Sequence, residues 1–158
     1  MNPFQLLLLL LLLTATPAFP AGEAATPFDT YGGYFVSNKF EPDAATSFVI
    51  IQDQEQFDRV FGAAFVMQDK SHRLAPDAFK THTILAVIHR GHAMWEYQVA
   101  KVSLRGGIAE LHFTGTSQKK SDDAEFACPL IVSIPKGNYP AVKFVENGKV
   151  EIVLKPAK

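Results

Sequence analysis

Hydrophobic residues in this chain form short runs and alternations that are typical of β-strands. Residues 83–88 include an unbroken apolar run, which favours a strand buried on both faces, and we expect it to be the central strand. Residues 47–51 are rich in strand formers. Further apolar segments predict strands at 34–40, at 126–134 and on both sides of the turns at 106–107 and 147–148.

The glycine pair at 106–107 predicts the most informative strand pairing. A two-residue turn there would place three apolar pairs on one face: Leu104 with Ala109, Val102 with Leu111, and Ala100 with Phe113. In that register Trp95 and Tyr97 lie on the other face. Two interpretations stay open. A bulge near Val99 and Ala100 lets both aromatic residues join a second part of the core beneath the helix or the long loop, or they form an exposed pair that anchors a protein partner.

One short helix is predicted after the strand at 47–51. Asp53 can cap it, and Gln56 stands three residues later, as in a capping box. Phe57, Val60 and Phe61 fall on one face before Gly62 ends the helix. Such a short helix needs to be held by packing its apolar face onto a sheet.

The remaining pattern completes the predicted fold. A hairpin turn at 147–148 would pair Glu146 with Lys149, Val145 with Val150, and Lys143 with Ile152. Residues 63–80 are predicted to be a long loop with a short helical turn. The fold class is therefore mainly β or α+β, with antiparallel sheets of six to eight strands and one short helix packed on the sheet.

The N-terminus has a different pattern, because residues 6–13 are eight consecutive leucines and the first 22 residues contain no charged side chain. Residues 1–21 are predicted to be a signal peptide, with the mature start between Phe19 and Ala25. A retained anchor is the alternative, but the apolar stretch is shorter than the roughly 20 residues of a membrane-spanning helix. We therefore expect an exported bacterial protein, periplasmic or extracellular, with no stable membrane span after cleavage.

The rest of the chain is long enough for one domain. Residues 22–30 are predicted to be a flexible lead-in, and residues 31–158 a single domain. Fifteen basic and sixteen acidic residues give a net charge of −1 with no long block of one sign, so we expect no nucleic-acid partner. The only cysteine, Cys128, is interpreted as a small buried apolar side chain, with a reactive thiol as the alternative.

Candidate chemistry in the sequence is sparse. There is no nucleophile elbow and no phosphate-binding loop, so we expect neither catalytic residues nor a cofactor. His89, His92 and His112 would supply three nitrogen ligands to zinc or copper if the fold brought them together, and solvent-exposed histidines are the competing interpretation. The candidate binding residues follow the central strand: Gly91, His92, Met94, Trp95 and Tyr97.

Five segments together carry a resemblance to a known family: 48–62, 76–79, 84–91, 96–101 and 129–135. In their order and content they resemble the C-terminal domain of the PrcB protease-complex subunit family. Members commonly have a Gly-Gly-Tyr element after the central strand, of which this chain keeps Tyr97. The resemblance implies an exported, non-enzymatic accessory or protein-binding domain that associates with or inhibits an extracytoplasmic protease. An exported metal-binding protein that uses the three histidines is the alternative.

Overall fold

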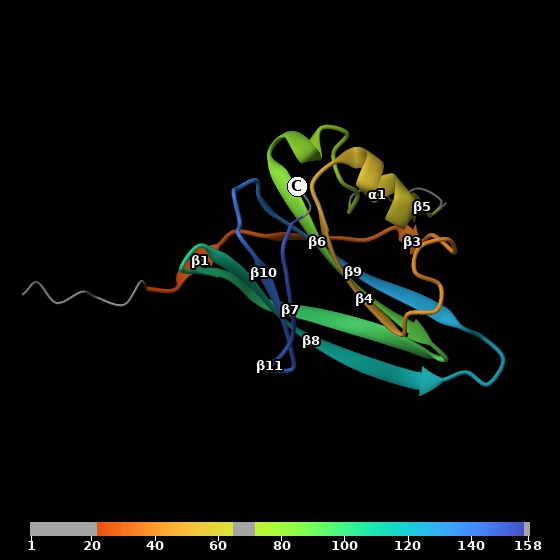
Figure 1. The fold of residues 1–158 in the computed structure, drawn as a ribbon. Coiled ribbons are helices and arrows are strands. Elements are labelled where there is room, and N and C mark those ends of the chain that lie inside the picture. Colours follow the sequence, from red (N-terminus) through yellow and green to blue (C-terminus); the bar gives the residue numbers. More distant parts are fainter. Residues whose placement is uncertain (1–21, 65–71, 157–158) are drawn as a thin grey trace, which may run out of the picture.

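The structure, a computed structural model, describes residues 22–64 and 72–156 and places them in two facing β-sheets with a further layer outside one of them (Figure 1). The described part of the chain contains eleven strands, one α-helix and one 3-10 helix. The β-rich class with one short helix is confirmed. The predicted signal peptide, residues 1–21, lies outside the described residues.

The first sheet has five strands, which are, in spatial order, β1 (Ala24–Thr26), β7 (Ala93–Arg105), β8 (Ile108–Lys120), β10 (Val142–Glu146) and β11 (Lys149–Leu154). The β8 and β10 strands are parallel, because the chain passes through the other sheet between them, and the other neighbours are antiparallel. This sheet is therefore mixed rather than antiparallel throughout.

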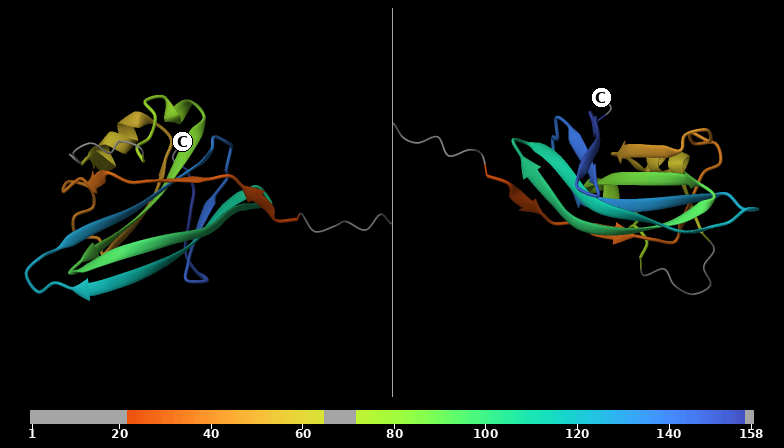
Figure 2. Two further views of the ribbon diagram at one scale, coloured as in Figure 1. Left: turned by 180° about the vertical axis from the view of Figure 1, so that it is seen from behind. Right: turned by 90° about the horizontal axis from the view of Figure 1, so that it is seen from below.

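The second sheet has four antiparallel strands in the order β2 (Asp29–Tyr31), β9 (Phe126–Pro135), β6 (His82–Gly91) and β4 (Thr46–Ile51). The outer layer covers the face of this sheet that points away from the first sheet, and it holds β3 (Tyr34–Val36), α1 (Gln54–Val60), β5 (Phe61–Ala63) and the 3-10 helix η1 (Ala78–Lys80). Figure 2 shows the helix on one side of the four-stranded sheet and the long β7 and β8 strands on the other.

Strand β6 is an inner strand of the four-stranded sheet and contributes to a core on each face of that sheet, as predicted for the central strand. Leu85 and Val87 belong to the core between the two sheets, whereas Ile84, Ala86 and Ile88 belong to the core beneath α1. All five side chains are completely buried. Burial of each of the larger ones contributes roughly 1.5–3 kcal/mol, so the unbroken apolar run stabilises both cores at once.

The predicted helix is present but shorter, because it ends at Val60 and the chain becomes extended at Phe61. Its N-cap is confirmed: Oδ1 of Asp53 accepts a hydrogen bond from the backbone N–H of Gln56 at 2.7 Å. Oε1 of Gln56 accepts from the N–H of Gln52, one residue before the cap. Seven residues make a marginal helix, and its buried residues Phe57 and Val60 hold it on the sheet.

The predicted flexible lead-in is wrong, because residues 22–30 contribute to both sheets. Strand β1 pairs with β7, and β2 pairs with β9. The carboxylate of Glu23 contacts the ammonium of Lys101 and lies 3.2 Å from Nη2 of Arg105, and these hydrogen bonds lower the pKa of Glu23 to about 2. A strand of three residues is too short to show a periodic hydrophobic pattern, so β1 and β2 can be recognised only from their pairing with β7 and β9.

The predicted register of the β7–β8 hairpin is correct near the turn and wrong beyond Lys101. A bulge at Ala100 places Val99, not Ala100, opposite Phe113, and the side chains of Trp95 and Tyr97 return to the core side of the sheet. A second bulge in the β10–β11 hairpin places Phe144, not Lys143, opposite Ile152. In the β7–β8 hairpin the bulge lets apolar side chains on either side of it, Val99 and Val102, face the core between the sheets.

Two further predictions need correction. The strand expected at 34–40 stops at Val36, since the chain turns there and the N–H of Phe40 donates to the carbonyl oxygen of Ser37. The predicted loop at 63–80 contains the expected helical turn as η1, and residues 65–71 lie outside the described residues. No helix in the described ranges is both long enough and apolar enough to span a membrane.

Candidate functional site

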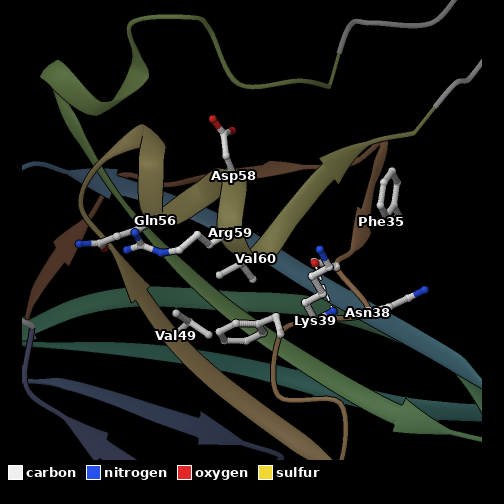
Figure 3. A pocket seen from close by; sticks show the side chains of 10 residues that line it. Phe35, Asn38, Lys39, Val49, Gln56, Asp58, Arg59 and Val60 are labelled. Atoms are coloured by element: carbon white, nitrogen blue, oxygen red, sulfur yellow. Dashed lines mark hydrogen bonds between the residues drawn. The ribbon is translucent and has the colours of Figure 1, made fainter.

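A groove of about 780 Å³ opens between α1 and the loop that joins β3 to β4. Val49 of β4 and Val60 of α1 point into it, and Phe40 also lines it (Figure 3). Lys39 and Arg59 lie on its rim, from the loop and the helix respectively. An apolar interior with a polar rim is the usual form of a site that receives an apolar side chain of a ligand.

An exposed aromatic ring lies at one end of this groove. The side chain of Phe35 is 54% exposed. Its ring lies over Gly62, where an added Cβ atom would come within 2.3 Å of the Cζ atom of Phe35. Gly62, predicted only as a helix terminator, therefore gives the ring its seat beside the groove.

The charges on the rim are unevenly paired. Arg59 lies 2.7 Å from the carboxylate of Glu55, and the carboxylate of Asp58 accepts a hydrogen bond from Gln54 at 2.7 Å. Lys39, on the facing wall, makes no ion pair with any described residue. Among the residues that the structure describes, the ammonium group of Lys39 has no carboxylate partner, and it can therefore meet a carboxylate of a ligand.

Arg90 positions the loop that forms one wall of the groove. Its Nη1 donates to the carbonyl oxygen of Ala44 at 3.1 Å and to Oγ of Ser47 at 2.7 Å, and its Nη2 donates to the carbonyl oxygen of Phe40 at 2.9 Å. The planar guanidinium can satisfy three acceptors in one plane, which a lysine cannot do. Arg90 thus ties residues 40–47 to the end of the central strand.

A buried polar cluster lies at the same end of β6, between the two sheets. His89 is 7% exposed and its ring stacks on Trp95, with 4.1 Å between centroids. Its Nδ1 lies 2.9 Å from the hydroxyl oxygen of Tyr97, and its Nε2 lies 3.4 Å from Oε2 of Glu146. The cluster therefore joins β6 of the four-stranded sheet to β7 and β10 of the five-stranded sheet.

Hydrogen-bond roles in this cluster follow from the single proton of the Tyr97 hydroxyl. That proton is donated to the carbonyl oxygen of Cys128 at 2.8 Å, so the tyrosine oxygen accepts from Nδ1–H of His89. Nε2 of the neutral ring is then an acceptor that faces Glu146. Nε2 and this carboxyl group lie 3.4 Å apart, so the protonation of one group affects the other.

Burial shifts the pKa of both His89 and Glu146. Burial lowers the pKa of His89, with the carboxylate of Glu151 opposing it. Burial, and in second place the carboxylate of Glu151, raises the pKa of Glu146. Both shifts disfavour an imidazolium–carboxylate ion pair at this contact.

The cluster is a poor acid–base site, because both nitrogens of His89 already have partners. Cys128 is half-buried rather than fully buried, and its Sγ accepts the backbone N–H of Trp95 at 3.3 Å. No nitrogen of His89 is left to activate this thiol. The geometry supports a structural role, in which the cluster connects the two sheets.

The five predicted binding residues do not form one exposed surface. Met94 is 52% exposed and His92 is also exposed, and Gly91 has a φ of 130° at the turn into β7. Trp95 and Tyr97 are half-buried and stack on His89, so the predicted bulge is confirmed and the exposed aromatic pair is wrong. Tyr97 packs on the core between the two sheets, so the expected position beneath the helix or the long loop is also wrong. His92 and Trp95 line a separate concavity of about 640 Å³.

The three histidines predicted as metal ligands lie in different surroundings. His89 is in the buried cluster, His92 lies against Glu125 and the carbonyl oxygen of Ala124, and His112 lies 3.2 Å from Glu110. In the two described ranges, no three His, Cys, Asp or Glu side chains are grouped so that they could hold a metal ion.

Several residues of both sites escaped prediction from the sequence. Lys39, Phe35 and Arg90 stand in segments without a motif, and Glu146 was read only as a hairpin position. For the bulge a signal did exist: apolar residues occupy odd positions from 95 to 99 and even positions at 102 and 104. Such a change of phase along one strand indicates a bulge.

Comparison of the chain with protein-family models, with curated proteins and with solved structures gives no match. The resemblance to the PrcB family therefore stays a prediction.

Proposed function

We propose that this chain is an exported accessory domain that binds another protein in the periplasm or outside the cell, and that its partner is a protease. The single observation that carries the binding role is the groove between α1 and the β3–β4 loop, with the exposed ring of Phe35 at its end. The groove is open, apolar inside and held in shape by Arg90. Such a surface favours contact with another polypeptide.

The sequence supports the other parts of the proposal. The leucine-rich segment at 6–13 favours export. The PrcB resemblance favours a non-enzymatic partner of an extracytoplasmic protease. The His89 cluster agrees with a non-enzymatic role, because Nδ1 of the imidazole is hydrogen-bonded to Tyr97 and Nε2 faces the buried Glu146.

Site-specific photo-crosslinking in the native cell envelope tests this function. A photoreactive residue at Asn38, on the groove rim, should give one discrete adduct with a protein that mass spectrometry identifies as a protease. The matched control places the same residue at Gln118, an exposed position on β8. No adduct at Asn38, or equal adducts at both positions, would contradict the binding role, and an adduct with a different protein would contradict the protease.

A further inference from the structure

Strand β4 is an edge strand without the features that normally protect one. It ends the four-stranded sheet and pairs only with β6. Its sequence, Thr-Ser-Phe-Val-Ile-Ile, contains no charged residue and no proline, and all six residues pair with β6 without a register shift. Charges, prolines, bulges, short length and cover by a helix or loop are the means by which proteins prevent edge strands from pairing with other chains.

The other edges of the two sheets have this protection. Strands β1 and β2 are three residues long, and β2 begins with Asp29. Strand β11 carries Lys149 and Glu151 and pairs with β10 through a bulge. The contrast makes β4 the edge that is open to another strand.

The backbone of β4 specifies what its occupant must be. Among the described residues, the backbone of residues 46–51 makes its ladder with β6 and takes part in none of the turn, loop and cap hydrogen bonds. The N–H and C=O groups of β4 that point away from β6 therefore have no backbone partner in the described part of the chain. Phe48, Val49 and Ile50 are only half-buried. An extended segment of polypeptide supplies the matching donors and acceptors along the whole edge.

The groove lies directly beside this edge. In Figure 3 strand β4 runs along the groove, with Val49 pointing into it and Lys39 on the opposite wall. Strand β11 approaches β4 from the facing sheet, so the added segment enters from the groove side. A segment paired with β4 would place alternate side chains on that side, one of them in the apolar interior.

We propose that an extended segment of the partner protein pairs with β4 as an additional strand, seats an apolar side chain between Val49 and Val60, and places a carboxylate near Lys39. This inference rests on the proposed function and names its mode of recognition. The backbone pairing selects an extended segment, and the ammonium of Lys39 selects an acidic residue next to the apolar one.

Hydrogen exchange on the free protein and on its complex with the partner cross-linked at Asn38 tests the pairing. Amides within residues 46–51 should exchange at least about tenfold more slowly in the complex, while those of β11 keep their rates. If the complex forms but β4 gains no protection, the inference fails and the proposed function stands. If no complex forms, both fail.

Two further measurements complete the test. Lys39→Glu should raise the dissociation constant of the complex with the partner about tenfold. Lys149→Glu, which changes an exposed lysine at the start of β11, should alter it less than about twofold. Equal effects of both substitutions would overturn the role of Lys39. Protection of β4 that rises with the concentration of this protein alone would assign the edge to a second copy and overturn the inference.

Discussion

Glu146 and His89 meet across the two sheets, with Oε2 of Glu146 lying 3.4 Å from Nε2 of His89. Both residues are buried, at 9% and 7% exposure. The Tyr97 hydroxyl fixes the proton of His89 on Nδ1, so the contact depends on a proton donated from the side of Glu146 or shared with it.

Two replacements of Glu146 distinguish a neutral hydrogen bond to His89 from a charged pair with it. Glu146→Gln should keep most of the stability, because its amide can donate to Nε2 of His89 at any pH. Glu146→Ala leaves that nitrogen without a partner and should lower the free energy of unfolding by about 1–3 kcal/mol. Urea denaturation measures both, and an equal loss in the two variants would indicate an imidazolium–carboxylate pair instead.

Gly115 on β8 gives Glu146 its path to His89. An added Cβ atom at this position would lie 2.2 Å from Oε1 of Glu146 and 3.4 Å from the ring of Trp95. Gly115→Ala should therefore destabilise the protein by about 1–3 kcal/mol. Gly32→Ala, where nothing lies within 4 Å of the added atom, is the matched control and should change stability by less than about 0.5 kcal/mol.

A double variant checks the cause of that loss. If the clash with Glu146 is responsible, Gly115→Ala should cost much less in the Glu146→Ala background. The same cost in both backgrounds would place the strain elsewhere in β8. Thermal unfolding of the natural chain, the two single variants and the double variant measures the four stabilities of this double-mutant cycle.

The lead-in should be needed for stability. A chain that begins at Gly32 lacks β1 and β2 and loses Phe28, which packs on the core between the sheets, and Tyr31, which packs on the core beneath α1. We expect it to lose more than about 3 kcal/mol relative to a chain that begins at Gly22. Equal denaturation midpoints for the two chains would show that the paired strands contribute little.

Cleavage of the predicted signal peptide should leave strands β1 and β2 intact. A cut after Ala24 would remove Glu23, whose carboxylate holds Lys101 and Arg105, and the pairing of Ala24 with Leu104. We therefore expect export to leave Phe19 as the first residue. The mass of the mature chain purified from the envelope measures this, and a chain that begins at Ala25 would contradict it.

Glu110 should make the stability of the folded protein decrease at acid pH. A hydrogen bond from the ammonium of Lys143, with a further one from His112, lowers the pKa of this buried carboxyl group below its ordinary value of 4.5, against the opposing effect of burial. A carboxyl group with a lower pKa in the folded state stabilises it above the ordinary pKa. That stability is lost as the pH falls through the lowered value.

Denaturation at a series of pH values between about 3 and 7 measures this effect. Glu110→Gln should lower stability at neutral pH by about 1–3 kcal/mol and flatten its fall toward acid pH. Glu55→Gln changes an exposed glutamate that pairs with Arg59, and should leave the shape of the profile intact. A Glu110→Gln profile parallel to that of the natural chain would contradict the assignment.

The sequence alone predicted the features that depend on local pattern. The apolar run in β6 marks a strand buried on both faces, and the Asp53 cap with the apolar face of Phe57 and Val60 marks the helix. The glycine turn at 106–107 places Leu104 opposite Ala109. Each of these follows from residues close together in the chain.

Only the tertiary structure revealed the groove and the polar cluster. The contacts of Phe35 with Gly62 and of His89 with Glu146 each join segments that are distant in the sequence. The pattern of hydrophobic positions within one segment does not indicate which other segment it contacts. The strands β1 and β2 are likewise held by β7 and β9 rather than by their own preferences. Local pattern determined which residues are buried, whereas long-range pairing and two bulges decided which of them meet, because such contacts form only once the sheets face each other.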